Sequence, residues 1–319
     1  MSDYILDFEL PLREIEVKID SLKSTGIKTG MDVSDGIKLL EEQLSERRKI
    51  IYDNLSRWER VQLARHPKRP YCSDLIVRMA NYWMELHGDR TFSDDPAMVC
   101  GIARLEELKV MIISQEKGRG TKKKVHHNFG MSRPEGYRKA LRLMKLAEKY
   151  NIPILTLIDT PGAYPGLGAE ERGQAEAIAR NIFEMSKLRV PIITAVIGEG
   201  ASGGALGIGV GDMIICFENT WYSVISPEGC AAILFRDSSR SAEAADSMMV
   251  TARDLKELGI ADTILPEPGG GNHLNYDEAA QTLKLAVIES IHAINAIDSD
   301  RRIQNRIDNF EKMGKWSDG

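Results

Sequence analysis

The sequence predicts an α/β domain that follows a helical N-terminal segment. After Arg69-Pro70, short apolar stretches of strand length alternate with amphipathic helical patterns, which is typical of α/β folds. Two successive units share one plan, in which a strand leads into a glycine-bearing loop and then into a helix. The first 70 residues show helical periodicity instead. We therefore divide the chain into a helical extension, residues 1–70, and a domain, residues 71–319.

The extension is expected to hold a long amphipathic helix. Apolar residues recur at helical spacing from Ile37 to Trp58, and Ser34-Asp35 offers a capping sequence before them. The opposite face is dense in charge, and residues 23–33 are expected to form a loop after a preceding helix. Such a helix suits docking or bracing rather than catalysis.

The domain is expected to begin with a β-hairpin, residues 97–105 and 110–115, around Glu106-Glu107. Further strands are predicted at residues 152–158, 190–197, 213–217 and 222–225. Helices are predicted at residues 136–150, 170–188, 203–211, 251–265 and 277–297. The two glycine-bearing loops, residues 159–168 and 198–204, follow neighbouring strands, and loops at such strand ends commonly build an active site.

The composition is that of an ordinary globular protein: 319 residues, 43% hydrophobic and 28% charged. No apolar run reaches the roughly 18 residues that span a bilayer, and the N-terminus lacks the basic flank of a secretion signal, so we expect a cytoplasmic protein without a membrane partner. The four cysteines form no C-x-x-C pair, which predicts reduced thiols and no metal site in this chain.

The overall charge argues against a nucleic-acid partner, since the formal net charge is −5 at pH 7. Basic residues nevertheless gather between Lys117 and Arg142. This cluster fits either a solvated surface or a local site for a phosphorylated ligand or an acidic partner.

Glycine is densest over residues 197–211, directly after the apolar run from Val190 to Val196. Each glycine costs about 1 kcal/mol in a helix relative to alanine, so this density needs a physical reason. A strand that runs into glycines and then into a helix start presents bare N–H groups, and these form an anion site.

Two motifs with other chemistry match parts of this segment. Glycines 198, 200 and 203 fit the G-x-G-x-x-G dinucleotide fingerprint, although the later glycines leave room for only a short helix. Ser202 fits the G-x-S-x-G elbow of serine hydrolases, with Asp262 and His273 following in triad order. The third interpretation is an oxyanion hole made by the backbone N–H groups of Gly203 and Gly204, which needs small residues and no nucleophile.

Longer strings surround the glycine segment. They are residues 159–166 (DTPGAYPG), 168–174 (GAEERGQ), 198–205 (GEGASGGA) and 222–230 (YSVISPEGC). Further strings are residues 64–71 (ARHPKRPY), 88–90 (GDR), 117–119 (KGR), 128–131 (NFGM) and 134–144 (PEGYRKALRLM). With these strings in order and at natural spacing, the chain resembles the carboxyltransferase α family of bacterial acetyl-CoA carboxylases, and the resemblance extends over almost the full chain.

The resemblance implies a crotonase-type fold, a spiral of ββα units behind the helical extension. It implies an enzyme that moves the carboxyl group of carboxybiotin, carried on a separate biotin carboxyl carrier protein, onto acetyl-CoA to give malonyl-CoA for fatty acid synthesis. The family forms an α2β2 assembly with a β subunit, works alongside a biotin carboxylase, and shares its active site between α and β chains. Its zinc ribbon belongs to the β subunit, which agrees with the absence of cysteine pairs here.

The resemblance also assigns residues. Two oxyanions develop in the reaction, one on the ureido oxygen of biotin and one on the thioester enolate, and the glycine pair Gly203 and Gly204 is expected to stabilise one of them. The remaining residues expected at the site, as pocket walls, loop or interface residues, or contacts of CoA phosphates or the β chain, are Gly162, Ala163, Ala205, Arg172, Glu228, Lys117, Arg119 and Lys124.

Two other functions stay open at the sequence level. One is a stand-alone crotonase-fold hydrolase or hydratase that uses Ser202 or a pocket acid, and the other is a noncatalytic scaffold. The chain also departs from the family at Ala201, where glycine is common; the added methyl group is tolerable if the φ angle of that residue is negative.

Overall fold

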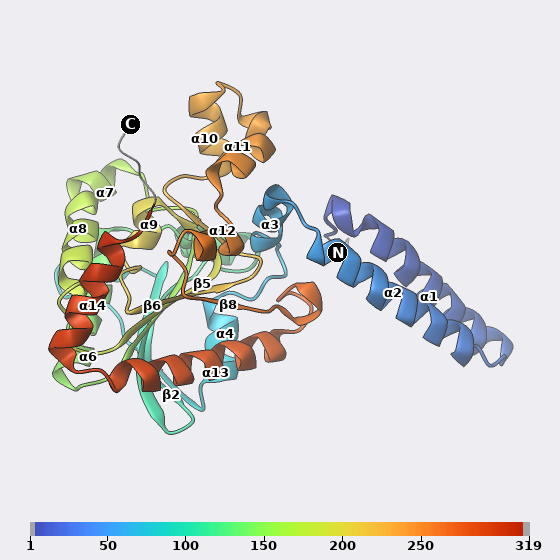
Figure 1. Cartoon of the computed structure of the whole chain (residues 1–319), viewed down its shortest axis with the longest axis horizontal. Coiled ribbons are helices and arrows are strands. Elements are labelled where there is room, and N and C mark those ends of the chain that lie inside the picture. The colour runs from blue at the N-terminus through green and yellow to red at the C-terminus, as the bar shows by residue number, and fades with distance from the viewer. Residues whose placement is uncertain (1–3, 315–319) are drawn as a thin grey trace.

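The computed structural model describes residues 4–314 and shows a mixed β-sheet with helices on both faces (Figure 1). A helical hairpin at the N-terminus projects away from this body. The architecture confirms the predicted α/β domain behind a helical extension. No helix within residues 4–314 is both long and apolar enough to cross a membrane.

The sheet has the strand order β1-β2-β3-β4-β5-β6-β8, with β7 paired to the end of β5. The first three strands are antiparallel and the remaining pairs are parallel. The strands are β1 (Tyr82–Glu85), β2 (Met98–Leu105), β3 (Leu108–Gln115), β4 (Ile154–Thr160), β5 (Ile192–Ala201), β6 (Met213–Phe217), β7 (Trp221–Ser223) and β8 (Thr263–Leu265). Every residue of β4 and β5 is buried, as expected for parallel strands covered on both faces.

Successive side chains of β5 enter different cores, because side chains alternate between the faces of a sheet. Ile192 and Val196 pack with α6 (Pro134–Lys149) and α8 (Gln174–Met185). Ile193 and Ile197 pack with α4 (Cys72–Met79) and α13 (Tyr276–Asn295) on the other face. The other helices of the body are α5 (Gly120–His126), α7 (Leu167–Glu171), α9 (Ser202–Leu206), α10 (Pro227–Leu234), α11 (Ser241–Met248), α12 (Ala252–Glu257) and α14 (Ser299–Glu311).

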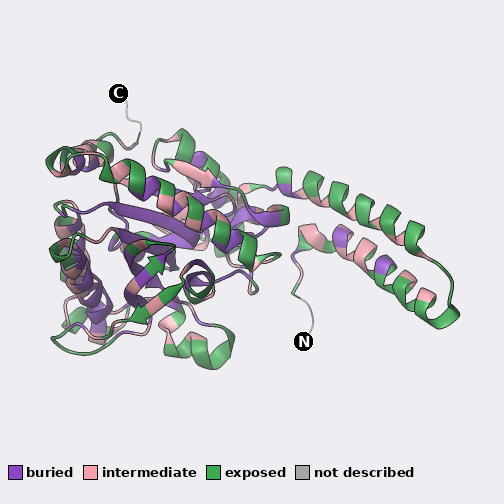
Figure 2. Ribbon diagram, turned by 90° about the horizontal axis from the view of Figure 1, so that it is seen from below, coloured by how far each residue is buried: buried purple, intermediate pink, exposed green. Residues whose placement is uncertain are grey.

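The projecting hairpin consists of α1 (Leu10–Thr29) and α2 (Ser34–Asp53). Its outer part is exposed on all sides, and no residue from 20 to 51 is buried (Figure 2). The next helix, α3 (Arg57–Ala64), lies against the body, where Val61 and Ala64 pack on Trp221. The part that projects is therefore α1 and α2 alone.

Several predicted elements are confirmed. The antiparallel hairpin β2–β3 turns at Glu106, helix α6 covers the predicted residues 136–150 to within two residues, and β6 has the predicted bounds. The C-terminal helix α14 had no predicted counterpart.

Five expectations about elements were wrong. Residues 23–33 were expected to form a loop, but helix α1 continues to Thr29, so that only residues 30–33 connect it to α2. The predicted helix from Ser34 to Trp58 ends at Asp53, and Trp58 begins the separate helix α3. The predicted helix over residues 170–188 breaks at Gly173, whose φ is +80°. Residues 251–265 form the short helix α12 and then strand β8 rather than one helix.

The last correction concerns the glycine segment itself. Residues 198–201 continue strand β5 instead of forming a loop, because Glu199 and Gly200 pair with Trp221 and Tyr222 of β7. Gly200 also pairs with Thr160 at the end of β4. The short helix that follows is confirmed, although it spans only Ser202–Leu206.

Candidate active site

Gly203 and Gly204 lie in the first turn of α9, directly after the C-terminal end of β5. The N–H groups of a first helical turn have no acceptor within the helix. Neither amide donates a hydrogen bond elsewhere in residues 4–314. Two amide donors therefore stand at the strand end, where the sequence predicted them. Ala201, before the helix, has a φ of −110°, so its methyl group causes no backbone strain.

The buried Gly204 packs against the segment that follows β4. A Cβ atom on Gly204 would lie 2.3 Å from the carbonyl carbon of Gly162 and 2.5 Å from the nitrogen of Ala163. The Gly204 carbonyl accepts hydrogen bonds from Gln115 Nε2 at 2.7 Å and from the Tyr137 hydroxyl at 3.2 Å. The two glycine-bearing segments thus meet at this point, as their place after neighbouring strands predicted.

Gly203 is half-buried and has more room. A Cβ atom there would touch only Ile178, at 3.6 Å. On its open side, Gly203 lines a cavity of about 440 Å³ whose exposed walls are mostly apolar. The walls come from α9, β7, α12 and the C-terminal helix α14, which contributes Phe310. One of the two glycines is therefore on the wall of an accessible apolar cavity.

Several of the other glycines serve internal packing. A Cβ atom on Gly198 would lie 2.3 Å from Asp159 Oδ1, and one on Gly200 would lie 2.7 Å from the Tyr222 ring. The expectation that the density of glycine reflects close approach to a ligand is thus wrong for these two positions. They are glycines because a carboxylate and an aromatic ring occupy the space of a side chain.

A network of charged side chains lies at the ends of β4 and β5. The Lys117 ammonium donates to Asp159 Oδ1 at 2.7 Å and to Glu199 Oε1 at 2.6 Å. Arg65, at the end of α3, donates to Glu199 Oε2 at 2.5 Å and also to Glu228 at the start of α10. The network joins five separate segments of the chain near the end of β5, where the glycine segment lies.

Burial and pairing set the charge states in this network. Burial alone would lower the pKa of Lys117, but the two carboxylates raise it above its ordinary value. Burial would raise the pKa of Glu199, but Lys117 and Arg65 hold it below its usual range. Burial raises the pKa of Asp159 in spite of the adjacent lysine.

The structure separates the predicted basic residues by their partners. Lys117 is paired as above, and Arg172 pairs with Glu135 at 2.9 Å. Arg119 pairs with Asp74 at 2.8 Å and lies over the ring of Tyr71. Lys124 lines a second cavity, of about 240 Å³. This cavity also includes Lys117 and Arg65 in its wall, together with Glu199, with which both of them pair.

The remaining predicted residues are divided between the glycine pair and the charged network. Ala163 contacts Gly204, Ala205 is fully buried beside it, and Glu228 is held by Arg65. Sequence reasoning missed Arg65 and Glu199, although both belong to strings that carried the resemblance. It also missed Gln115 and Tyr137, whose contacts with Gly204 no sequence pattern indicates.

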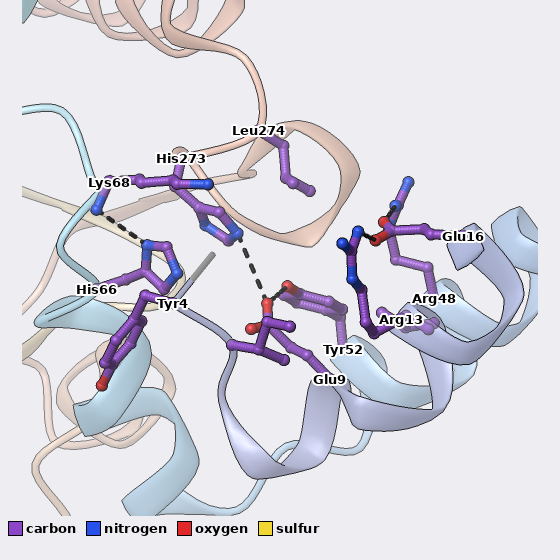
Figure 3. A pocket seen from close by; sticks show the side chains of 12 residues that line it. Tyr4, Glu9, Arg13, Glu16, Arg48, Tyr52, His66, Lys68, His273 and Leu274 are labelled. Carbon is purple, nitrogen blue, oxygen red and sulfur yellow. Dashed lines mark hydrogen bonds and ion pairs between the residues drawn. The ribbon is translucent and has the colours of Figure 1, made fainter. Parts of the chain in front are cut away.

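The serine-hydrolase triad is not assembled. His273 lies at the junction between the projecting hairpin and the body, where its Nε2 is 3.6 Å from Glu9 and its ring stacks on His66 at 4.2 Å (Figure 3). Ser202 lines the apolar cavity instead, to which His273 does not contribute. The dinucleotide fingerprint also fails structurally, since Gly198 and Gly200 are strand residues and the following helix has five residues.

Among residues 4–314, no group of three or more His, Cys, Asp or Glu side chains is placed to hold a metal ion. All four cysteines are free thiols, and burial raises the pKa of Cys100 and Cys216 to about 12. The donors that the site offers are thus amides, hydroxyl groups such as those of Ser202 and Ser223 on the cavity wall, and the cations of the network.

The chain is similar to known proteins over nearly its whole length. Residues 5–314 match the family model described as acetyl co-enzyme A carboxylase carboxyltransferase-like. The chain is 51% identical to the acetyl-coenzyme A carboxylase carboxyl transferase subunit alpha of Chlorobium luteolum, with 99% of each chain covered. It is 48% identical to the protein of the same name from Flavobacterium psychrophilum, over 98% of this chain and 99% of that one.

Solved structures share the fold at low identity. Transcarboxylase 12S superimposes with a TM-score of 0.54 at 20% identity, over 66% of this chain and 40% of that one. The β subunit of geranyl-CoA carboxylase from P. aeruginosa gives a TM-score of 0.54 at 20% identity, over 74% of this chain and 45% of that one. The chain thus spans less than half the length of these two structures, and the crotonase-type carboxyltransferase fold expected from the sequence is confirmed.

Proposed function

The chain belongs to the acetyl co-enzyme A carboxylase carboxyltransferase family, and from this premise we propose that it is the α subunit of that enzyme. With a β subunit it transfers the carboxyl group of carboxybiotin to acetyl-CoA and gives malonyl-CoA for fatty acid synthesis. The observation that supports this most directly is the pair of amide donors at Gly203 and Gly204, beside an accessible apolar cavity and without an assembled nucleophile.

The chemistry asked of this chain is stabilisation of developing negative charge. Preorganised N–H groups do this because they need not reorient during the reaction. Each such donor stabilises the transition state by about 3 kcal/mol at a water-excluded site. Bound biotin supplies the activated carboxyl group, and the apolar cavity, with Gly203 on its wall, fits a largely hydrocarbon group that carries a carbonyl oxygen. The Gly204 carbonyl is held by Gln115 and Tyr137, so the peptide that carries these donors is fixed before substrate arrives.

The other site residues are proposed in three roles. Gly162, Ala163 and Ala205 keep the wall beside Gly204 small. Lys117, Arg172 and Glu228, which are held in internal ion pairs, shape the loops around the pocket. Arg119, which is exposed, and Lys124, which lines the second cavity, are candidates for contact with CoA phosphates or with the β subunit.

The partners follow from the same reaction. A reaction that is biotin-dependent and acts on CoA thioesters needs a biotin carboxyl carrier protein and a biotin carboxylase as well as the β subunit. We propose an α2β2 core in the cytoplasm, with residues 1–70 as the extension and residues 71–319 as the carboxyltransferase domain.

The experiment that tests this function is malonyl-CoA decarboxylation dependent on a biotin analogue, measured with the chain alone and after mixing with a β subunit. Activity only in the mixture is the expected result. Full activity of the isolated chain would contradict a shared site. No activity in the mixture would favour the interpretation of the chain as a noncatalytic scaffold. Labelling of Ser202 by a fluorophosphonate probe would support a hydrolase instead.

A further inference from the structure

Ser202, the first residue of α9, has a left-handed backbone conformation. Its φ is +58°, between Ala201 in the extended region and the glycine pair. This conformation costs an L-amino acid roughly 1–2 kcal/mol, whereas glycine adopts it freely. A serine therefore stands at a position where the backbone alone would favour a glycine.

The Ser202 side chain lies on the wall of the apolar cavity. Most of the other residues of that wall have apolar side chains: Leu206, Ile214, Val224, Leu255, Ile260, Phe310 and Met313. The Ser202 hydroxyl makes no hydrogen bond with any other residue of the described chain, 4–314, and the residue is exposed. The cavity thus offers an available hydroxyl next to the Gly203 amide.

We propose that the Ser202 hydroxyl is a substrate-binding donor, which hydrogen-bonds to the carbonyl oxygen of the group that enters this cavity. This inference rests on the proposed function and adds a side-chain contact to the backbone site. The ligand it fits has an apolar body and one carbonyl acceptor. An acyl thioester and the ureido ring of biotin both have this chemistry, and the hydroxyl binds rather than reacts.

The test uses Ser202→Ala and Ser202→Gly in the assembled α–β complex, with KM measured separately for malonyl-CoA and for biocytin. Alanine removes the hydroxyl but keeps the backbone strain, whereas glycine removes both. Loss of one neutral hydrogen bond is expected to raise one KM by about 3- to 10-fold in both variants, with kcat nearly unchanged. The substrate whose KM rises identifies the carbonyl.

Thermal unfolding separates the backbone from the hydroxyl. Ser202→Gly is expected to raise Tm by about 1–3 °C, and Ser202→Ala is not. Glu106→Gly is the matched control, because Glu106 has a φ of +55° in the exposed β2–β3 turn, far along the sheet from the cavity. It should raise Tm similarly and leave both KM values unchanged.

Unchanged KM values in both Ser202 variants would overturn the inference, as would a rise confined to one of the two variants. A wild-type complex without any decarboxylation would instead contradict the proposed function, so the two failures are distinguishable. A fall in kcat with both KM values unchanged would also overturn the binding role.

Discussion

At the scale of single residues, the two glycines at the start of α9 differ in what a methyl group would meet. A Cβ atom on Gly204 would overlap the backbone of Gly162 and Ala163, which cannot move without shifting the end of β4. A Cβ atom on Gly203 would make an ordinary contact with Ile178. Gly204→Ala is therefore expected to destabilise the chain by about 1–3 kcal/mol and to abolish carboxyl transfer.

Gly203→Ala is the matched control for this prediction. It keeps the N–H group and is expected to change the free energy of unfolding by less than about 0.5 kcal/mol and to retain activity. Denaturant unfolding and decarboxylation assays of both variants check the pair. A stable but inactive Gly203→Ala would show that its methyl group meets the substrate or the β subunit rather than α8.

Lys117 is expected to be essential for stability, because it is the ammonium that bridges Asp159 and Glu199. Its side chain is 11% exposed, and its partners are 3% and 8% exposed. Lys117→Met leaves two buried carboxylates without this cation, which costs about 3–5 kcal/mol. Urea unfolding at neutral pH measures this loss.

Lys122→Met provides the comparison for Lys117, since it removes the same charge from an exposed position on α5. It should alter the free energy of unfolding by no more than about 0.5 kcal/mol. Equal changes in the free energy of unfolding for the two variants would mean that the charged network adds no stability beyond the effect of the overall charge.

At the scale of elements, the sequence predicted where most strands begin more reliably than where they end. The apolar run of residues 190–197 marked β5, but its continuation to Ala201 depends on β7, which pairs with it from more than 20 residues later. Glycines that look like a loop by local propensity become strand residues once a partner strand supplies their hydrogen bonds. Helix α12 and strand β8 were merged for a related reason, since β8 is a strand through its pairing with the distant β6.

Site residues that belong to one local motif could be predicted, whereas those that depend on distant partners were missed. Gly203 and Gly204 belong to one local motif, so the sequence was enough to find them. Arg65 acts through Glu199 and Glu228, which are 134 and 163 residues away in sequence. No spacing rule connects such positions, and the paired state of Lys117 was hidden for the same reason.

The junction between the hairpin and the body is expected to be sensitive to pH through His66. Its Nδ1 accepts the Lys68 N–H at 3.1 Å, which requires a neutral nitrogen, and burial together with nearby His273 lowers its pKa from 6.5 to about 4. Between these values the unfolded chain binds a proton that the folded chain does not. The contribution of His66 to the free energy of unfolding is therefore fully present above pH 6.5 and is lost as the pH falls towards 4. It decreases by about 2 kcal/mol between pH 7 and pH 5.

His66→Asn keeps an acceptor for the Lys68 amide but does not titrate, so it should lose this part of the pH dependence. Glu9 does not contribute in the same range: although burial acts to raise its pKa, hydrogen bonds from His273 and Tyr52 lower it to about 2, and its stabilisation is lost only below pH 4.5. Free energies of unfolding of wild type and variant at pH 7 and pH 5 provide the measurement. The same slope in both proteins would contradict the role of His66.

At the scale of the whole molecule, the body and the projecting hairpin bury their residues very differently. The body has two cores, one on each face of the sheet, whereas α1 and α2 together bury only Leu12, Ile19 and Tyr52. A pair of helices gains most of its stability from packing an apolar face. Exposed apolar side chains remain along the hairpin, among them Val17, Ile27, Met31, Leu39 and Ile50.

This difference predicts that the hairpin serves assembly rather than folding. Deleting residues 23–29 and 34–40 removes about two turns from each helix and keeps the connecting turn, residues 30–33, without removing any buried residue. The free energy of unfolding of the body should change by less than about 1 kcal/mol, because none of its packing is altered.

Binding to the β subunit, or self-association, should weaken at least tenfold, because exposed apolar surface of this kind marks contact sites. Light scattering and sedimentation of the mixture measure the second effect. A shortened chain that assembles with the same mass and affinity would show that the outer half of the hairpin has no partner.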